Sequence, residues 1–379
     1  MFKVSPSVNA LGGGTIYLSC LLRYILVILV FKTFIEIIHV KEKATSFDIA
    51  YQAGVSQSTV SRALRNSPLV NEETRLKVQA IAKELNYKVD KNASNLRSQH
   101  CDTIALLLFE DPTNDDSAIN PFFLSMLGSI TRACAHKGYD LLVSFQQASN
   151  DWHADFEDSN KADGLILLGY GDYVDFEEKL IKLSEQGTHF VRWGAEVKNL
   201  STVSIGCDNF LGGKEITEHV IKQGRKNFAF LGSASSHAPE FFDRYKGHCQ
   251  ALNDNNLVVN SDMQFNALYT EEAGYEAACE LIKSGGKFDA ICAACDLIAI
   301  GAMRALQEYN ISIPEQVVVV GFDDIAIASF TFPPLTTVKQ DTQLAGELLV
   351  NTLLESINGK ETSTTLIAPE LVIRKSCGC

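Results

Sequence analysis

The sequence lacks the short motifs with which many enzymes hold nucleotides or metal ions. No GxGxxG follows a predicted strand and no GxxxxGK[S/T] occurs, so folds built on those phosphate loops are disfavoured. Cys292 and Cys295 form a CxxC, but neither a second cysteine pair nor a histidine cluster stands at zinc-site spacing. We therefore expect no metal site and no cofactor.

A disulfide framework and an enzymatic centre are also missing. The ten cysteines are scattered, several within apolar runs, which favours buried, reduced thiols and a reducing compartment. The "SCGC" that holds Cys377 and Cys379 is expected to be an exposed tail rather than a metal site. The densest acidic cluster, at residues 110–116, lies in one loop and offers no carboxylate pair across a cleft. The chain is expected not to be an enzyme.

Positive charge is scarce over most of the chain. The 379 residues carry a net charge of −13, of which residues 1–40 contribute +2, residues 41–100 contribute +4 and residues 101–379 contribute −19. This length exceeds one ordinary core, so two or three compact units are expected. A small basic module joined to a large acidic body is typical of a polyanion-binding head on a body that stays off polyanions.

Residues 1–40 form an apolar extension. The run Thr15–Val40 is long enough to span a bilayer. However, Arg23, Lys32 and Glu36 interrupt it, and each would cost about 3 kcal/mol at the bilayer centre. No small-residue cleavage site follows, which disfavours a signal peptide. Three interpretations remain: a native start near residue 41, a single membrane anchor, or a partner-binding helix.

Residues 43–88 have the pattern of a small all-α unit with three helices. Ser46, Ser56 and Asn71 are the expected N-caps. The expected buried residues recur at helical spacing in each segment: Phe47, Ile49, Ala50 and Ala53 in the first, Val60, Ala63 and Leu64 in the second, and Leu76, Ala80, Ile81 and Leu85 in the third.

The first two of these helices have the spacing of a helix-turn-helix. Ala50 supplies a small side chain where the helices cross, Gly54 tolerates the positive φ of the turn, and Val60 packs the second helix back on the first. This arrangement lays the second helix in a DNA major groove, with its N-terminal residues at the base edges.

The polar side chains around the second helix suit that role. Gln57 and Ser58 stand at its N-terminus, and Arg62, one turn along, can reach a guanine or a phosphate. Hydroxyls suited to backbone contacts come from Ser56, Thr59 and Ser61. Thr45 and Asn66, at the flanks, complete the predicted contacts.

Residues 101–379 alternate strand-length apolar runs with helix-length segments. The runs are TIALLLF, DLLVSF, DGLILLG, HFVRWG, TVSIG, NFAFLG, DAICAA and VVVVGF. Such alternation predicts βαβ units and parallel sheets. The repeat restarts near Ser201–Asp208, so we expect two α/β lobes with crossing strands, and Pro333–Val338 is a rigid, extended return segment.

These motifs together resemble the LacI/GalR family of bacterial transcriptional regulators. The stretch from "DIAYQAGVSQSTVSRAL" to "NASNLR" is similar to the family's DNA-binding head and hinge. NPFF, DN..GG, FDRYKG, CDLIAIGAMRAL, VVGFDD and PPLTTV follow in the family's order. The resemblance implies a helix-turn-helix head at 43–88, a hinge helix at 89–100, and an effector-binding and dimerisation core at 101–379 that is similar to periplasmic sugar-binding proteins.

The resemblance also implies roles for individual residues. Gln57, Ser58 and Arg62 fall where such regulators read the operator. Ala93 and Leu96 fall on the hinge helix, with Leu96 as the apolar wedge that opens a base step in the minor groove. Where the family often has a proline after the head, this chain has Val89.

In the core, the resemblance to periplasmic sugar-binding proteins implies that Arg244 and Asp323 are the effector contacts, and Asp296 is expected at a βα turn facing the cleft. Phe122, Phe123 and Trp193 are candidates for contact with a sugar ring. Each has a structural alternative: core packing for Trp193, lobe packing for the two phenylalanines, and a surface salt bridge for Arg244.

The expected function is a repressor of carbohydrate-utilisation genes that a neutral sugar releases from double-stranded operator DNA. We expect a homodimer or higher oligomer in the cytoplasm, at the nucleoid. The alternative, a membrane-tethered or periplasmic sugar receptor, would have no use for a helix-turn-helix followed by a wedge hinge.

Overall fold

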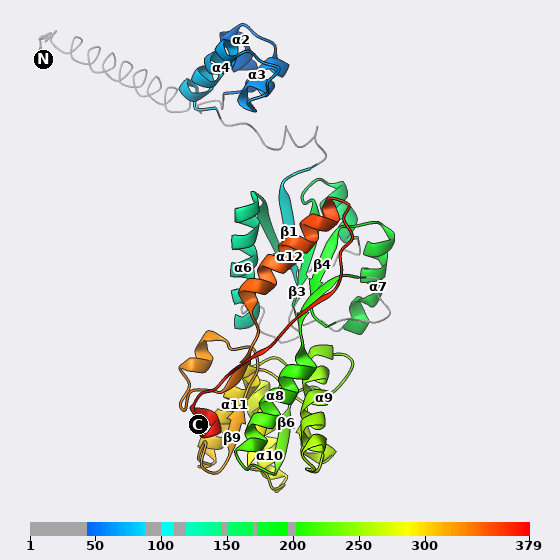
Figure 1. Ribbon diagram of the computed structural model, residues 1–379, viewed down its shortest axis with the longest axis vertical. Coiled ribbons are helices and arrows are strands. Elements are labelled where there is room, and N and C mark those ends of the chain that lie inside the picture. The colour runs from blue at the N-terminus through cyan, green and yellow to red at the C-terminus, as the bar shows by residue number, and fades with distance from the viewer. Residues whose placement is uncertain (1–43, 88–99, 110–118, 146–150, 170–172, 196–201) are drawn as a thin grey trace, which may run out of the picture. The chain divides into compact units, whose positions relative to one another are not determined.

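The computed structural model describes residues 44–87, 100–109, 119–145, 151–169, 173–195 and 202–379. The chain divides into two compact units, Met1–Ser94 and Asn95–Cys379 (Figure 1). Residues 15–40, the hinge residues Ala93 and Leu96, and the acidic cluster at 110–116 lie outside the described residues. Within the described ranges, no helix has the length and apolar character needed to cross a membrane.

The described part of the head contains three helices, α2 (Ser46–Ala53), α3 (Gln57–Leu64) and α4 (Glu72–Glu84). The predicted turn is confirmed, because Gly54 ends α2 with φ at 69°. The N-cap of α2 is Thr45 rather than the predicted Ser46. Thr45 and Asp48 form a capping box in which each side chain accepts from the other's backbone N–H, so two free helix-end donors are satisfied at once.

The buried residues of the head confirm the predicted crossing of α2 and α3. They also show that the buried faces of α2 and α4 were in part predicted incorrectly. Ala50 and Val60 are buried, as expected. Phe47 is 68% exposed, Leu76 is 57% exposed and Ala80 is also exposed, so all three were wrongly predicted as core. The buried residue in each case lies two positions further on, at Ile49, Val78 and Ala82, about 200° around the helix.

The N-terminal lobe of the core is a parallel sheet between helices. The described strands are β1 (Thr103–Leu108), β2 (Asp140–Phe145), β3 (Gly164–Leu168), β4 (Phe190–Trp193), β5 (Ser204–Cys207) and β11 (Thr365–Ile367), in the order β11-β5-β4-β3-β1-β2. The helical segments are α6 (Pro121–Lys137), η1 (Ala154–Asp158), α7 (Tyr173–Glu185) and α12 (Thr342–Ile357).

Both faces of the inner strands β1, β3, β4 and β5 are covered, which explains their continuous apolar runs, whereas the edge strand β2 is largely exposed. Along β1, Ile104 and Leu106 join the cluster that includes residues of α6 and α12. Ala105 and Leu107 point to the opposite cluster, which includes Leu180 of α7. The two-residue period of a strand therefore assigns alternate side chains to two separate cores.

The C-terminal lobe repeats the design with a second parallel sheet. Its described strands are β6 (Phe228–Leu231), β7 (Gln264–Phe265), β8 (Ala290–Ala293) and β9 (Val318–Val320), in the order β7-β6-β8-β9. Its helices are α8 (Asn209–Lys222), α9 (Pro239–Asp254), α10 (Glu271–Lys283) and α11 (Asp296–Glu308), with short 3-10 turns η2 (Ser261–Met263), η3 (Ala326–Ser329) and η4 (Lys375–Cys377).

The chain passes between the lobes at three places within the described core. The passages lie between β5 and α8, between β10 (Thr337–Lys339) and α12, and between β11 and β12 (Glu370–Val372). β10 and β12 pair antiparallel, and the predicted extended segment at 333–338 leads into β10. These passages place Asn209 and Gln340 next to the lobe boundary.

The prediction of buried, reduced cysteines is confirmed for most of the described core. Its nine described cysteines are free, and Cys292 and Cys295 of the CxxC are buried. The prediction of an exposed tail at "SCGC" is wrong for Cys377, which is 1% exposed because η4 packs beneath β9 and α8. Cys379 is exposed, as expected.

Candidate nucleic-acid interface and ligand site

The N-terminus of α3 is organised by hydroxyl groups. Ser56 is the N-cap, and its Oγ accepts from the Thr59 backbone N–H at 3.2 Å. The same Oγ lies 2.9 Å from the hydroxyls of Ser58 and of Thr59. Gln57 Nε2 donates to Ser46 Oγ at 2.8 Å, so its carboxamide is held across to α2. Hydrogen bonds within the head therefore hold Gln57 and Ser58, which are predicted to contact base edges, in defined positions.

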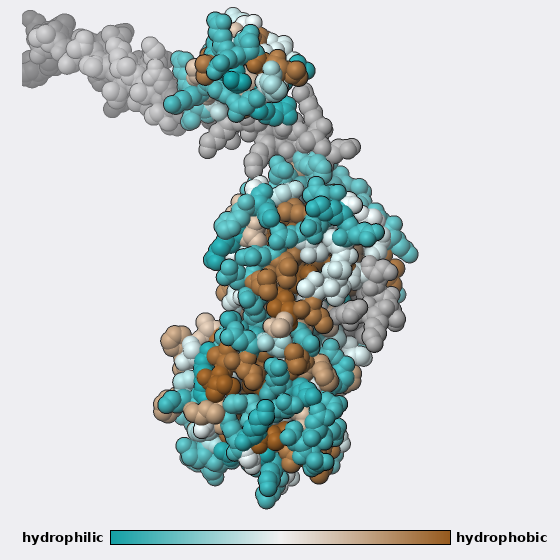
Figure 2. All heavy atoms as spheres, viewed as in Figure 1, coloured by the Kyte–Doolittle hydropathy of each residue, from teal (hydrophilic) through white to brown (hydrophobic). Residues whose placement is uncertain are grey.

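The outer face of α3 carries cationic groups. Arg62 is exposed, and no acidic side chain among the described residues of the head forms an ion pair with it. The neighbouring Arg65 donates to Ser61 Oγ at 2.7 Å, so Ser61 orients a second guanidinium that sequence reasoning missed. Figure 2 shows the head with a mostly hydrophilic surface. This face therefore suits a polyanion.

Thr45 and Asn66 have local structural roles at the ends of the motif. Hydrogen bonds from Thr45 lower the pKa of Asp48, which keeps that carboxylate charged at the positive end of α2. Asn66 adopts φ of 55°, and its Oδ1 accepts from Gln79 of α4 at 2.8 Å. Both residues support the motif from its flanks.

In the core, Arg244 of α9 is the centre of a buried polar network. Its side chain is 2% exposed, so the alternative of a surface salt bridge is wrong. Nε donates to Asn209 Oδ1 at 2.8 Å, and Nη1 donates to the Ala294 carbonyl at 2.5 Å. The guanidinium carbon lies 3.7 Å from the centroid of the Phe322 ring, within cation–π distance.

Asp323 completes this network from the loop after β9. Its Oδ1 lies 3.3 Å from Arg244 Nη1 and accepts from Gln340 Nε2 at 2.6 Å. Its backbone has φ of 111°, a region that non-glycine residues rarely occupy and that commonly marks a functional position. Asn209 and Gln340 sit at two passages between the lobes, so the network joins both.

Asp296 stabilises the loop after β9 that carries Asp323. It is fully buried, with Oδ1 accepting from Thr337 Oγ1 at 2.5 Å and Oδ2 from the Ile325 N–H at 2.9 Å. Burial, followed by the Asp323 carboxylate, raises the pKa of Asp296 well above its usual range. Asp296 lies at the βα turn between β8 and α11, as expected, and its buried carboxylate braces the segment that carries Asp323.

The predicted aromatic contacts lie together in the N-terminal lobe. Phe122 packs edge-on against Phe123 at 5.3 Å between ring centroids and lies 6.0 Å from Trp193. All three are buried, at 1%, 4% and 4% exposed. In this structure the rings contact one another, as the packing alternative expected.

Sequence reasoning missed Glu240, Gln340 and the structural use of Asn209. Glu240 lies in the first turn of α9, is 4% exposed, and its Oε1 accepts from the Ala195 N–H at 3.1 Å. This bond joins the α9 of Arg244 to the segment after Trp193. Asn209 stood within the quoted DN..GG motif, and Glu240 followed a helix-starting proline, but Gln340 gave no signal.

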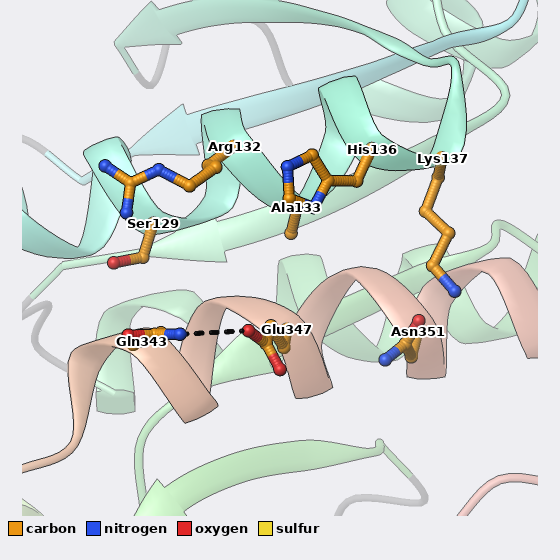
Figure 3. Close-up of a pocket in the computed structure, with 8 residues that line it drawn as sticks. All are labelled: Ser129, Arg132, Ala133, His136, Lys137, Gln343, Glu347 and Asn351. Carbon is orange, nitrogen blue, oxygen red and sulfur yellow. Dashed lines mark hydrogen bonds between the residues drawn. The ribbon is translucent and has the colours of Figure 1, made fainter.

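A separate groove of about 460 Å³ lies between α6 and α12 (Figure 3). Its lining is polar, and none of the predicted site residues takes part: Ser129, Arg132, Ala133, His136, Lys137, Gln343, Glu347 and Asn351. Arg132, His136 and Lys137 are exposed to solvent. The predicted effector contacts Arg244 and Asp323 lie apart from this groove, in the buried network of the C-terminal lobe.

Comparison with known families matches both parts of the chain. The model for "Bacterial regulatory proteins, lacI family" matches residues 47–90, and the model for a "Periplasmic binding protein-like domain" matches residues 217–377. The HTH-type transcriptional repressor PurR of Histophilus somni (strain 2336) is 30% identical over 339 residues, covering 88% of this chain and 98% of that protein.

Solved structures share the fold. A lac repressor dimer bound to operator and the anti-inducer ONPF has a TM-score of 0.77 at 24% identity, covering 89% of this chain and 99% of that chain. A complex of the transcriptional regulator CelR with cellobiose has a TM-score of 0.66 at 26% identity, covering 88% and 99%.

The network makes a specific prediction for stability. Arg244→Ala leaves Asp323 buried without its cation and should lower the free energy of unfolding by about 3–5 kcal/mol in urea denaturation. The control is Arg304→Ala, because Arg304 is 41% exposed and pairs at the surface with Glu271 and Glu272. Its loss should stay below about 1 kcal/mol. Equal losses in the two variants would show that the Arg244 pair is not the buried support described above.

Proposed function

The chain belongs to the lacI family of bacterial regulatory proteins, and we propose that it is a repressor whose operator affinity falls when a small neutral sugar binds its core. The observation that carries this proposal is the Arg244–Asp323 network, which is bonded to the two lobe passages at Asn209 and Gln340. A ligand that rearranges this network changes the bonds that set the lobes against each other.

We assign sequence-specific DNA binding to the head. In the proposal Gln57, Ser58 and Arg62 meet base edges in the major groove, and hydroxyls of Ser56, Thr59 and Ser61 meet the backbone. Ala93 and Leu96, outside the described residues, are proposed as the hinge contact and wedge. Thr45 and Asn66 hold the motif's ends. A protein with this role works at the nucleoid, in the cytoplasm.

A sugar suits the chemistry of the core network. Arg244 offers a fork of donors and Asp323 a pair of acceptors, which are the partners that vicinal hydroxyls need. Phe122, Phe123 and Trp193 supply apolar ring surface in the other lobe, which a sugar ring can contact once the lobes reorient. The CelR relative binds cellobiose, which supports a sugar over a purine or an amino acid.

Dimerisation is proposed through an exposed apolar patch on the C-terminal lobe. Ile327, Phe330 and Phe332 around η3 are 52%, 84% and 97% exposed. Figure 2 shows apolar surface gathered on this lobe among hydrophilic residues. Aromatic side chains this exposed favour burial against a partner, and a second copy with the same patch forms a closed two-fold pair. Two heads then meet two operator half-sites.

Operator recognition is tested first at Arg62. Arg62→Ala should cost about 1–3 kcal/mol in binding to the operator and much less on unrelated DNA, because a bidentate guanine contact is lost. The measurement is a gel shift or anisotropy titration at fixed salt. Arg75→Ala, on α4 and paired with Glu72, is the control and should change both affinities little. A uniform loss on all sequences would assign Arg62 to phosphate contacts instead.

The effector is tested with a thermal-shift screen of neutral mono- and disaccharides, followed by operator release. A sugar at about 100 Kd should stabilise the protein by about 2.7 kcal/mol. By reciprocity it should weaken operator binding by the factor by which DNA weakens sugar binding. Arg244→Lys keeps a cation opposite Asp323 but loses the fork, so it should bind operator and fail to respond.

Arg304→Lys serves as the matched control and should respond like wild type. If Arg244→Lys releases DNA at the wild-type sugar concentration, the assigned site is wrong. A sugar that tightens operator binding would reverse the proposed direction of regulation.

The dimer is tested by Phe330→Ser combined with Phe332→Ser. Because both side chains are exposed, this double variant should fold normally and sediment as a monomer at concentrations where wild type is a dimer. Val258→Ser, at an equally exposed valine of the same lobe, should stay dimeric. A dimeric Phe330/Phe332 variant would place the interface elsewhere.

A further inference from the structure

The end of the C-terminal lobe brings three metal-ligand side chains together. His219 Nε2 lies 3.5 Å from Cys377 Sγ and 3.8 Å from Cys379 Sγ. The three donor atoms all fall within 4.8 Å of one another. They come from positions about 160 residues apart in the chain, so only the fold creates this cluster.

We propose that His219, Cys377 and Cys379 bind a Zn²⁺ ion. Zinc takes tetrahedral Cys/His sites with Zn–S near 2.3 Å and Zn–N near 2.0–2.1 Å, which requires N···S separations of about 3.6 Å. The two observed N···S distances, 3.5 and 3.8 Å, bracket that value. The side chains therefore stand at ligand spacing with little movement required.

The backbone around the two thiols is held in place. Ser376 is fully buried, its Oγ donating to the Val319 carbonyl at 2.6 Å and accepting from the Thr336 N–H at 2.8 Å. Gly378 has φ of 91°, which reverses the chain between Cys377 and Cys379 and turns both sulfurs toward α8. Such a turn would strain a side-chain-bearing residue at this position.

The partners of the cluster also point to a missing ligand. Gln223, at the end of α8, stands 2.7 Å from His219 Nε2 and 2.8 Å from Cys379 Sγ through its Nε2. Its Oε1 is buried, with no hydrogen-bond partner among the described residues. An ion would take the lone pairs that now accept from Gln223, and the carboxamide can turn its oxygen toward the metal as the fourth ligand.

One face of the cluster is open and the other is closed. Cys377 is 1% exposed and its Sγ accepts from Thr336 Oγ1 at 3.1 Å, whereas Cys379 is exposed. The ion therefore enters from solvent and fastens the segment after β12 to α8. Thr336 is followed by Thr337, which bonds Asp296, so the site stabilises the strand behind the ligand network.

The test is a Zn²⁺ titration of the purified, reduced full chain against a chromophoric competitor chelator. Wild type should bind one Zn²⁺ per chain and gain thermal stability. Cys379→Ser and His219→Gln should each weaken binding by at least about tenfold, since even residues behind metal ligands cost 10–100-fold. Cys249→Ser and His136→Gln, at a thiol and an imidazole outside the cluster, should bind like wild type.

A second readout separates ligation from general damage. Co²⁺ in place of Zn²⁺ should give thiolate-to-metal absorption in wild type and in Cys249→Ser, and lose it in Cys379→Ser. Unchanged Zn²⁺ affinity in both cluster variants would overturn the proposal. So would a Cys377–Cys379 disulfide, found by mass, that excess Zn²⁺ does not prevent under air.

Discussion

The C-terminal lobe of the core is organised around the buried positive charge of Arg244. A guanidinium without water must be paired and fully hydrogen-bonded, or it costs several kcal/mol. Arg244 meets this requirement with Asp323, Asn209, the Ala294 carbonyl and the Phe322 ring. These partners come from α8, from the loop after β8 and from the loop after β9, so one charge fixes three separate segments of the lobe.

The same compensation connects the two lobes. Asn209 begins α8 directly after the chain leaves the N-terminal sheet, and Gln340 precedes α12 where the chain returns to it. In the proposed function, a sugar hydroxyl that bonds Arg244 or Asp323 would compete with these two carboxamides. It would then shift the lobe equilibrium by the difference between its affinities for the two arrangements. The network that we propose as the sugar site is thus also a structural connection between the lobes.

The sequence predicts the larger elements because each carries its own signal. Eight apolar runs became β1 to β6, β8 and β9, and all of them except the exposed edge strand β2 are buried, which requires apolar residues throughout. β7, β10, β11 and β12 are two or three residues long and owe their existence to neighbours supplied by the fold. Phe47 and Leu76 failed for a related reason: three short helices bury narrow stripes, and periodicity alone did not fix their rotation.

The candidate sites divide in the same way. The helix-turn-helix is a local motif, and the spacing of Ala50, Gly54 and Val60 is sufficient to predict it. Arg244 and Asp323 were reachable only through family resemblance, because 79 positions in the sequence separate side chains that lie 3.3 Å apart. His219 and Cys379 carry no shared pattern at all. A motif search reads spacing along the chain, whereas the helix and the turn bring these donors together in space.

Charge distribution explains why the molecule needs both parts. The body's −19 opposes DNA and the +4 of residues 41–100 is small, so one head alone holds a duplex weakly and in a strongly salt-dependent way. Joining two heads makes the second contact intramolecular, which raises affinity without any new contact. That gain depends on the spacing of the heads. In the proposed function, a rearrangement at Arg244 would remove the benefit of the second head, and the acidic body would favour release.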